Sequence, residues 1–296
     1  MTDRTPGAGS SGRLGPTVAG RWYPANRREL ELQIDSLIES SASSPAIDTP
    51  PGAIIAPHAG YIYSGSVAAS AFRLLRNEPV ATVILIGPSH YSAFEGAALP
   101  AASSYATPLG EVPLALEPIR QLADRPEIHI GDRPFSSEHS LEAEIPFLQR
   151  MLRPGWQLLP LLIGTGGRDE ARRAVAHALR PLWGRDTLVV VSSDFTHYGH
   201  SFGYVPFEDR IAERLETLDM GAVRLILAGD GEGFAAYVSR TGATICGQAA
   251  IRVLLGMSRS TTDASMVAYD TSGRLTGNWE HSVSYASLVF QRASRA

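Results

Sequence analysis

The sequence predicts an α/β protein in which helices cover both faces of a mixed sheet. Apolar runs at residues 53–55, 81–87 and 187–193 show little polar alternation, which is typical of strands buried on both faces. Helical patterns separate these runs along the chain, as in α/β folds. Two later runs, at 265–270 and 282–290, do alternate, which indicates antiparallel or edge strands.

The remaining elements follow from local patterns. Residues 27–38 show a helical pattern whose apolar set is Leu30, Leu32, Ile34, Leu37 and Ile38. A loop rich in serine and proline is expected at 40–51, and irregular structure at 91–113. Further helices are expected at 67–75, 114–123 and 168–183, and three more helical segments in 206–257. Residues 134–146 contain the pattern of a capped helix start. One more strand is expected at 156–164.

A single domain is predicted over residues 16–296, because no linker or solenoid repeat divides the chain. The glycine- and serine-rich residues 1–15 contain no apolar core and are expected to form a disordered tail. They also lack the apolar segment of a signal peptide.

Composition excludes several classes of function. The net charge is −4 without a basic run, which argues against nucleic-acid binding. No apolar stretch is long enough to cross a membrane, so no membrane partner is expected. Cys246 is the one cysteine and cannot form an internal disulfide. The expected location is the cytoplasm.

Histidines follow three of the predicted strands. His58 comes after 53–55, His90 after 81–87, and Asp194 with His197 after 187–193. Neighbouring parallel strands would bring these groups to one sheet edge, where ligands of α/β proteins bind. Imidazoles from separate loops favour a divalent-metal site. The alternative is that each histidine is a hydrogen-bonded structural residue.

Asp194 and His197 are three residues apart in the segment S-S-D-F-T-H-Y-G. On one helical turn they would share a face, and the carboxylate would fix the imidazole tautomer for acid–base catalysis. They are therefore the candidate catalytic residues. Alternatively, Asp194 is a helix N-cap and His197 a satisfied neighbour.

Cys246 precedes a predicted helix in T-I-C-G-Q. A helix N-terminus lowers a thiol pKa, so Cys246 is a candidate metal ligand or nucleophile. The alternative is a small buried apolar residue.

The segment E-H-S-L-E-A-E supplies further acid–base groups in His139, Glu142 and Glu144. Glu138 and Glu142 would share a helix face, and charges in such a pattern are mostly solvated. Trp22 and Tyr23 would line a pocket or simply pack. Neither G-x-S-x-G nor G-x-x-x-x-G-K-[ST] occurs, which argues against an α/β-hydrolase and a nucleoside-triphosphate enzyme.

Taken together, the motifs resemble the Memo family. A-P-H-A-G-Y, G-P-S-H, E-H-S-L-E, S-S-D-F-T-H-Y-G and T-I-C-G occur in that family's order, between R-W-Y-P and N-W-E-H-S-V-S-Y-A. The likeness covers residues 18–290. The family includes a eukaryotic mediator of cell motility and the prokaryotic B component of the AmmeMemoRadiSam system.

The resemblance implies a three-layer α/β/α sandwich around a central mixed sheet, similar to class III extradiol dioxygenases. It implies His58, His90 and Cys246 as metal ligands, with Asp194 and His197 beside them. Trp22, Tyr61 and His139 are the candidate substrate-binding residues. A thiolate in place of the dioxygenase carboxylate favours copper, zinc or a differently tuned iron, so ring cleavage does not follow from the fold.

Three functions remain open at this point. The first is a metal-dependent oxidoreductase that uses iron or copper. Zinc fits the same ligands but has no redox chemistry. The second is a non-enzymatic module that binds a peptide or small molecule in the same pocket. The third uses Cys246 as a nucleophile with His197 as its base.

The prokaryotic relatives imply two partners, an AMMECR-type protein and a radical-SAM enzyme. This chain carries no cysteine-rich motif for an iron–sulfur cluster, so any such cluster would belong to a partner.

Overall fold

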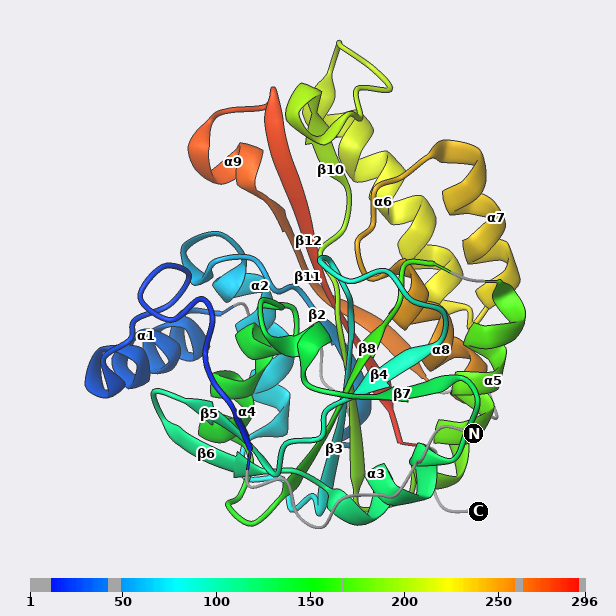
Figure 1. Ribbon diagram of the computed structural model, residues 1–296. Coiled ribbons are helices and arrows are strands. Elements are labelled where there is room, and N and C mark those ends of the chain that lie inside the picture. The colour runs from blue at the N-terminus through cyan, green and yellow to red at the C-terminus, as the bar shows by residue number, and fades with distance from the viewer. Residues whose placement is uncertain (1–11, 42–48, 167, 259–262, 293–296) are drawn as a thin grey trace.

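The computed structural model describes residues 12–41, 49–166, 168–258 and 263–292 (Figure 1). Within these ranges, nine strands form one sheet in the order β10-β12-β2-β9-β3-β8-β4-β7, and β11 pairs with β12. Its strands are β2 (Pro51–Ala56), β3 (Thr82–Pro88), β4 (Ala97–Leu99), β7 (Ile128–Ile130), β8 (Gln157–Ile163), β9 (Thr187–Ser192), β10 (His197–Gly199), β11 (Ala264–Thr271) and β12 (His281–Gln291).

The centre of the sheet consists of four parallel strands, β2, β9, β3 and β8. Val191 pairs with both Ile55 and Ile86, so β2, β9 and β3 end at the same edge. All residues of β2 and β9 are buried. The prediction of strands buried on both faces is confirmed, and the register aligns the loops that follow them.

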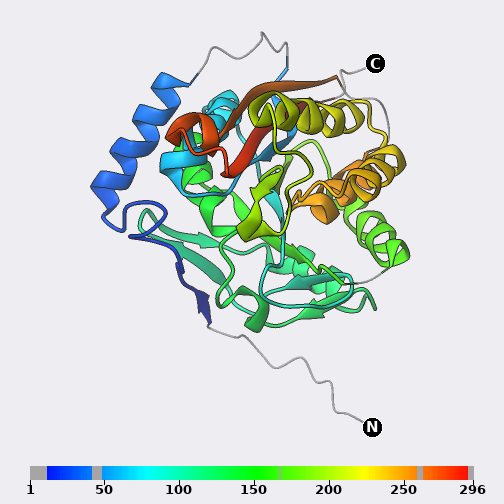
Figure 2. The same cartoon turned by 90° about the horizontal axis from the view of Figure 1, so that it is seen from above.

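Helices form a layer on each face of the sheet (Figures 1 and 2). One layer contains α1 (Arg27–Ser40), α2 (Tyr61–Phe72) and α4 (Ile145–Met151), and the other α5 (Asp169–Leu179), α6 (Ile211–Leu227), α7 (Gly231–Thr241) and α8 (Gln248–Met257). The short helices α3 (Leu116–Ala123) and α9 (Ser272–Thr276) lie near the ends of the sheet. The predicted α/β sandwich is confirmed.

Helix α1 shows how the sequence produces these layers. The Asn26 side chain accepts a hydrogen bond from the Glu29 amide and so caps the first turn. Leu30, Ile34 and Ile38 recur every four residues and are buried, while the other face is mostly exposed. The helix therefore forms where an apolar stripe meets the core.

The C-terminal strands β11 and β12 pair antiparallel, as predicted. Strand β12 also pairs with β2 and β10, so it lies inside the sheet. Helix α9 connects the two strands. This arrangement brings residues 272–285 to the end of the sheet that carries the histidine loops.

Two predictions about irregular segments are corrected. Residues 91–113 contain β4, β5 (Ser104–Thr107) and β6 (Gly110–Pro113), because short strands rich in alanine and serine pair with distant segments and lack a local signal. Arg13–Leu14 form β1 and pair with β5, so the predicted tail extends too far. Residues 1–11 and 42–48 lie outside the described ranges.

Among the described residues, no helix combines the length and apolar character that a membrane span requires.

Candidate metal centre

Three strand-end loops bring their polar side chains together. His58, His90 and Asp194 each lie two residues beyond the end of β2, β3 and β9. Because these strands are parallel neighbours in register, their loops meet at one edge. The convergence expected from the sequence is present.

Cys246 reaches the same point from the segment that precedes α8. One ligand atom from each of His58, His90 and Cys246 lies within 4.8 Å of the others. The Cys246 Sγ is 3.4 Å from His58 Nε2. Gly247 permits this approach, since a Cβ there would collide with Ser193, and its amide donates to Ser193 Oγ at 3.1 Å.

Hydrogen bonds orient the His58 ring. Its Nδ1 is 2.7 Å from Ser192 Oγ, and that hydroxyl donates to the Ser140 carbonyl at 2.6 Å. Ser192 Oγ therefore accepts from His58 Nδ1–H, which leaves the Nε2 lone pair directed toward Cys246. Burial, and then the neighbouring His90, lower the His58 pKa well below its ordinary value, which keeps the ring neutral.

Glu144 lies beneath this chain of hydrogen bonds. Its Oε1 is 2.7 Å from Ser192 Oγ, and its side chain is fully buried. Burial raises the Glu144 pKa well above its ordinary value, against the hydrogen bond from Ser192 Oγ. Ser192 Oγ thus accepts from His58 Nδ1, and the Ser140 carbonyl and Glu144 Oε1 are both within reach of its single proton.

Glu138 orients His90. Glu138 Oε1 accepts from His90 Nδ1 at 2.9 Å, and Oε2 accepts from the His90 amide at 2.6 Å. Burial opposes the charged form, but the hydrogen bond and charge of His90 prevail and lower the Glu138 pKa to about 2. A carboxylate on one imidazole nitrogen fixes the ring and raises the basicity of the other nitrogen.

The prediction that Glu138 and Glu142 are solvated on a helix face is wrong. Both are buried, and residues 142–144 form a short 3₁₀ turn before α4. Glu142 accepts hydrogen bonds from the Val18 amide and the Tyr23 hydroxyl, and so anchors the N-terminal segment. Tertiary hydrogen bonds, which the local pattern does not report, replace the lost water.

The predicted pairing of Asp194 with His197 is also corrected. His197 begins strand β10 and is not on a helix with Asp194. Its Nδ1 lies 3.0 Å from the Phe195 carbonyl and 3.1 Å from the Thr244 carbonyl, so it carries the proton and leaves Nε2 as an acceptor. Asp194 Oδ1 instead accepts from the His58 amide at 2.8 Å.

Electrostatics at Asp194 and Cys246 follow from burial. Burial raises the Asp194 pKa, against the opposing effects of His197 and the backbone amides of His58 and Ala59. Burial, then Asp194, raise the Cys246 pKa well above its ordinary value. The predicted low thiol pKa is therefore wrong for the protein without metal, because desolvation outweighs the helix N-terminus.

A cavity of about 730 Å³ opens in front of these groups. His58, His90, Asp194 and His197 line it. Trp22 and His139 also line it, with ring centroids 4.3 Å apart. Burial, then His58 and His90, lower the His139 pKa to about 3, so this ring is neutral at physiological pH.

Tyr61 does not line the cavity as predicted. It is buried, and its hydroxyl donates to the Ala143 carbonyl at 2.7 Å. Because Tyr61 begins helix α2, the next two residues, Ile62 and Tyr63, turn toward the cavity in its place. The register of a helix, which a linear motif does not show, decides this difference.

The far wall of the cavity consists of residues that the sequence argument missed. They come from the turn after β10, from the β11–β12 connection and from β12 itself, and they are Phe202, Ser272, Thr276, Asn278, His281, Val283 and Tyr285. Their one local signal is the segment N-W-E-H-S, which concentrates polar and aromatic groups before a strand.

Comparison with known proteins identifies the family. The family described as Memo-like protein matches residues 15–289, so the chain belongs to the Memo family. A MEMO1 family protein of Thermococcus kodakarensis is 32% identical over 290 residues, which is 94% of this chain and 99% of the relative. The memo-1 homolog of Caenorhabditis elegans is 31% identical over 287 residues, covering 92% of this chain and 80% of that protein.

A third relative, a MEMO1 family protein of Thermoplasma volcanium, is 31% identical over 276 residues, covering 93% of this chain and 97% of the relative. These names identify a family and state no reaction. The activity has to be argued from the site.

The donor set fits a metal ion. Two imidazoles and one thiol place one ligand atom each within 4.8 Å of the others, and the ring nitrogens not bound to Ser192 or Glu138 remain for coordination. Metal binding would displace the thiol proton, which overcomes the raised pKa of Cys246. His90, Glu138 and His139 form a second such group. It shares His90, and Glu138 is already committed to backbone amides.

Proposed function

We propose that the protein is a metal-dependent oxidoreductase that acts on a small organic substrate, with iron or copper held by His58, His90 and Cys246. The observation that carries the proposal is the convergence of three ligand atoms within 4.8 Å, beside a cavity of about 730 Å³. The mixed nitrogen and sulfur donors suit iron, copper or zinc, and only the first two change oxidation state.

A bound iron or copper ion would supply one-electron chemistry and Lewis acidity. The chain's own residues would bind the substrate and move protons. His197 Nε2 is an acceptor on the cavity wall and is the candidate base, while Asp194 holds the His58 backbone in place. Trp22, Tyr63 and His139 present flat rings that would position an aromatic or apolar substrate.

Anaerobic loading with iron(II) or copper(I), followed by metal analysis of the desalted protein, tests the centre. We expect stoichiometric metal in the native protein and an at least about tenfold lower content in His58→Ala, His90→Ala and Cys246→Ser. His177→Ala, on the exposed face of α5, is the matched control and should retain the metal. Full retention in the three ligand variants would overturn the proposal.

Turnover requires a second measurement. Oxygen consumption by the iron-loaded protein is measured with a set of small phenols and catechols. The rate of oxygen consumption should depend strongly on His197, whereas the metal content should not. His197→Gln should keep the metal and lose most of the rate, about 100-fold for a missing acid–base group. Equal rates in the native and His197→Gln proteins would exclude this residue as the base.

A specific observation favours a second candidate, a module that binds a peptide partner. Ile62 and Tyr63 line the cavity, although their side chains are 73% and 41% exposed. Apolar groups at the mouth of a pocket are typical of interaction sites. Binding of a peptide library that survives chelation and Cys246→Ser, but not Ile62→Asp, would support this function over catalysis.

The family resemblance leads to a proposal about partners and location. We propose an AMMECR-type protein and a radical-SAM enzyme as partners, and the cytoplasm as the compartment, where a reducing pool keeps Cys246 available as a ligand. Co-purification of tagged protein from native cells, with fractionation, tests both points. Recovery in a membrane or exported fraction without either partner would refute them.

A further inference from the structure

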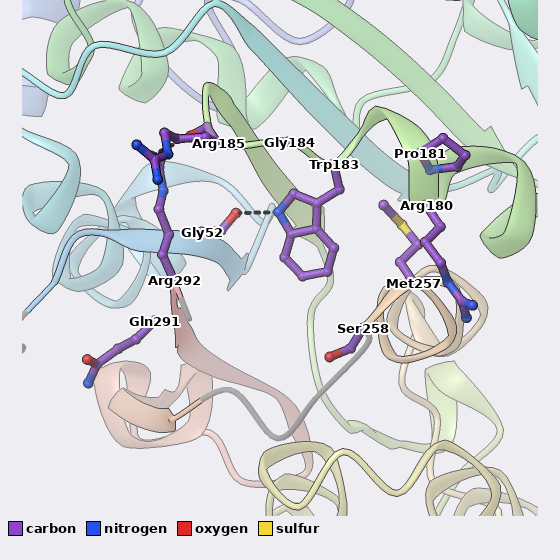
Figure 3. Close-up of a pocket in the computed structure, with 10 residues that line it drawn as sticks. All are labelled: Gly52, Arg180, Pro181, Trp183, Gly184, Arg185, Met257, Ser258, Gln291 and Arg292. Carbon is purple, nitrogen blue, oxygen red and sulfur yellow. Dashed lines mark hydrogen bonds between the residues drawn. The ribbon is translucent and has the colours of Figure 1, made fainter. Parts of the chain in front are cut away.

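A second cavity lies at the opposite end of β2 from the metal centre (Figure 3). Its volume is about 410 Å³, which is in the range of small-molecule sites. Gly52 at the start of β2, the turn after α5, the end of α8 and the end of β12 surround it. His58 lies beyond the other end of the same strand, so the two sites are separate.

Three arginines line this cavity, Arg180, Arg185 and Arg292. No aspartate or glutamate is among the lining residues that the structure describes. Within the described part of the chain, none of the three forms an ion pair with a carboxylate. The cavity is therefore locally positive in a protein whose net charge is −4. Guanidinium groups in this number recognise phosphate and carboxylate oxygens.

The arginines are anchored but retain unused donors. Arg180 Nη2 donates to the Gly256 carbonyl at 2.5 Å, and Arg292 Nη1 donates to the Arg185 carbonyl at 2.6 Å. The Nε atoms of Arg180 and Arg292 are buried and have no hydrogen-bond partner among the described residues. Because these Nε atoms have almost no accessible surface, an anion in the cavity would meet the other guanidinium nitrogens.

Trp183 supplies an apolar surface between the arginines. Figure 3 shows its indole between Arg292 and Arg185 on one side and Arg180 on the other. Its Nε1 donates to the Gly52 carbonyl at 3.3 Å, which fixes the ring, and Met257 and Pro181 add apolar lining. Gly52 also leaves room for Arg292, whose Cγ would lie 3.0 Å from a Cβ at that position.

We propose that this cavity binds a phosphate monoester that carries a flat ring, of the nucleoside monophosphate class. Three arginines that form no ion pair with a carboxylate of the described residues match a dianion, and the fixed indole matches a ring that stacks on it. A cavity of about 410 Å³ holds a small molecule and not a folded partner. The site is independent of the proposed metal chemistry.

Isothermal titration of the full chain with adenosine 5′-monophosphate tests the site. We expect saturable binding, with adenosine and inorganic phosphate each at least about tenfold weaker because each lacks half of the contacts. Arg180→Gln and Arg292→Gln should each weaken binding at least about tenfold. Arg185 is exposed, so Arg185→Gln should weaken binding without disturbing the packing.

Controls separate this site from the rest of the molecule. Arg120→Gln removes an exposed arginine that pairs with Glu117 on α3 and should not change binding. His58→Ala should also bind the probe normally, and Arg292→Gln should retain the metal. The absence of saturable binding, equal binding of phosphate alone, or loss of binding in His58→Ala or Arg120→Gln would each overturn the proposal.

Discussion

The two histidines of the metal centre are held by different hydrogen-bond partners. His90 donates to the ionised Glu138, whereas His58 donates to the neutral hydroxyl of Ser192, which Glu144 supports. A carboxylate partner makes an imidazole a stronger donor to a metal than a hydroxyl partner does. The two rings therefore differ in ligand strength although both follow a strand end.

Glu138→Gln tests this difference. The amide keeps the size of the side chain, but it removes the negative charge and turns one acceptor into a donor that faces an N–H group. We expect metal affinity to fall about 10–100-fold, as for other hydrogen-bonded partners of metal ligands. Competition with a chromophoric chelator measures it.

Glu111→Gln is the matched control, because Glu111 is an exposed carboxylate that pairs with Arg13. It should bind metal like the native protein. An unchanged affinity in folded Glu138→Gln protein would show that the carboxylate does not tune His90.

At the scale of elements, α8 matters because Cys246 lies just before its start and because it packs beside α5. Asp169 at the start of α5 accepts from Arg252 of α8 at 2.7 Å and from Arg172 at 2.8 Å. The bonds to Arg252 and Arg172 hold the Asp169 pKa well below its ordinary value of 3.8. This ion pair fixes the position of α8 relative to α5.

The stability that Asp169 contributes should depend on pH. Its pKa is lowered in the folded state, so the contribution is present above about 3.9 and is lost as the pH falls through the folded pKa. Because the side chain is 40% exposed, Asp169→Asn should cost only about 1 kcal/mol near neutral pH. Urea unfolding from neutral to acidic pH measures it.

The native and Asp169→Asn proteins should converge in stability as the pH falls. Glu170→Gln is the control, since it removes another negative charge from the same first turn of α5 without breaking an interhelical pair. If the difference in unfolding free energy between the native and Asp169→Asn proteins stayed constant down to acidic pH, the ion-pair explanation would be wrong.

At the scale of the molecule, the metal centre joins elements from across the chain. His58 follows β2, His90 follows β3 and Cys246 precedes α8. A bound ion would therefore crosslink the loops after β2 and β3 to the start of α8. The unfolded chain does not present these ligands together. Metal binding should therefore stabilise the folded state.

Calorimetry with and without metal measures this linkage. At free metal about 100-fold above the dissociation constant, the native protein should gain about 2.7 kcal/mol and unfold several degrees higher. Chelation should reverse the shift, and Cys246→Ser should reduce it strongly. His177→Ala should shift like the native protein. An equal shift in Cys246→Ser would show that the ion binds elsewhere.

The sequence by itself determined the architecture and the core of the site. Apolar runs without alternation located β2, β3, β8 and β9, because a strand buried on both faces has no polar side. The same runs also located the site residues, because His58, His90 and Asp194 follow three of those strands. The linear order of motifs indicated the family, which the comparisons confirmed.

Only the tertiary structure decided the partners of those residues. The burial of Glu138, Glu142 and Glu144 depends on segments that are far apart in the chain, and so does the contact of His197 with the Thr244 carbonyl. Tyr61 turned inward, and residues 272–285 closed the cavity, for the same reason. Sequence periodicity reports neighbours within a few residues, whereas hydrogen bonds of buried groups depend on how whole elements pack.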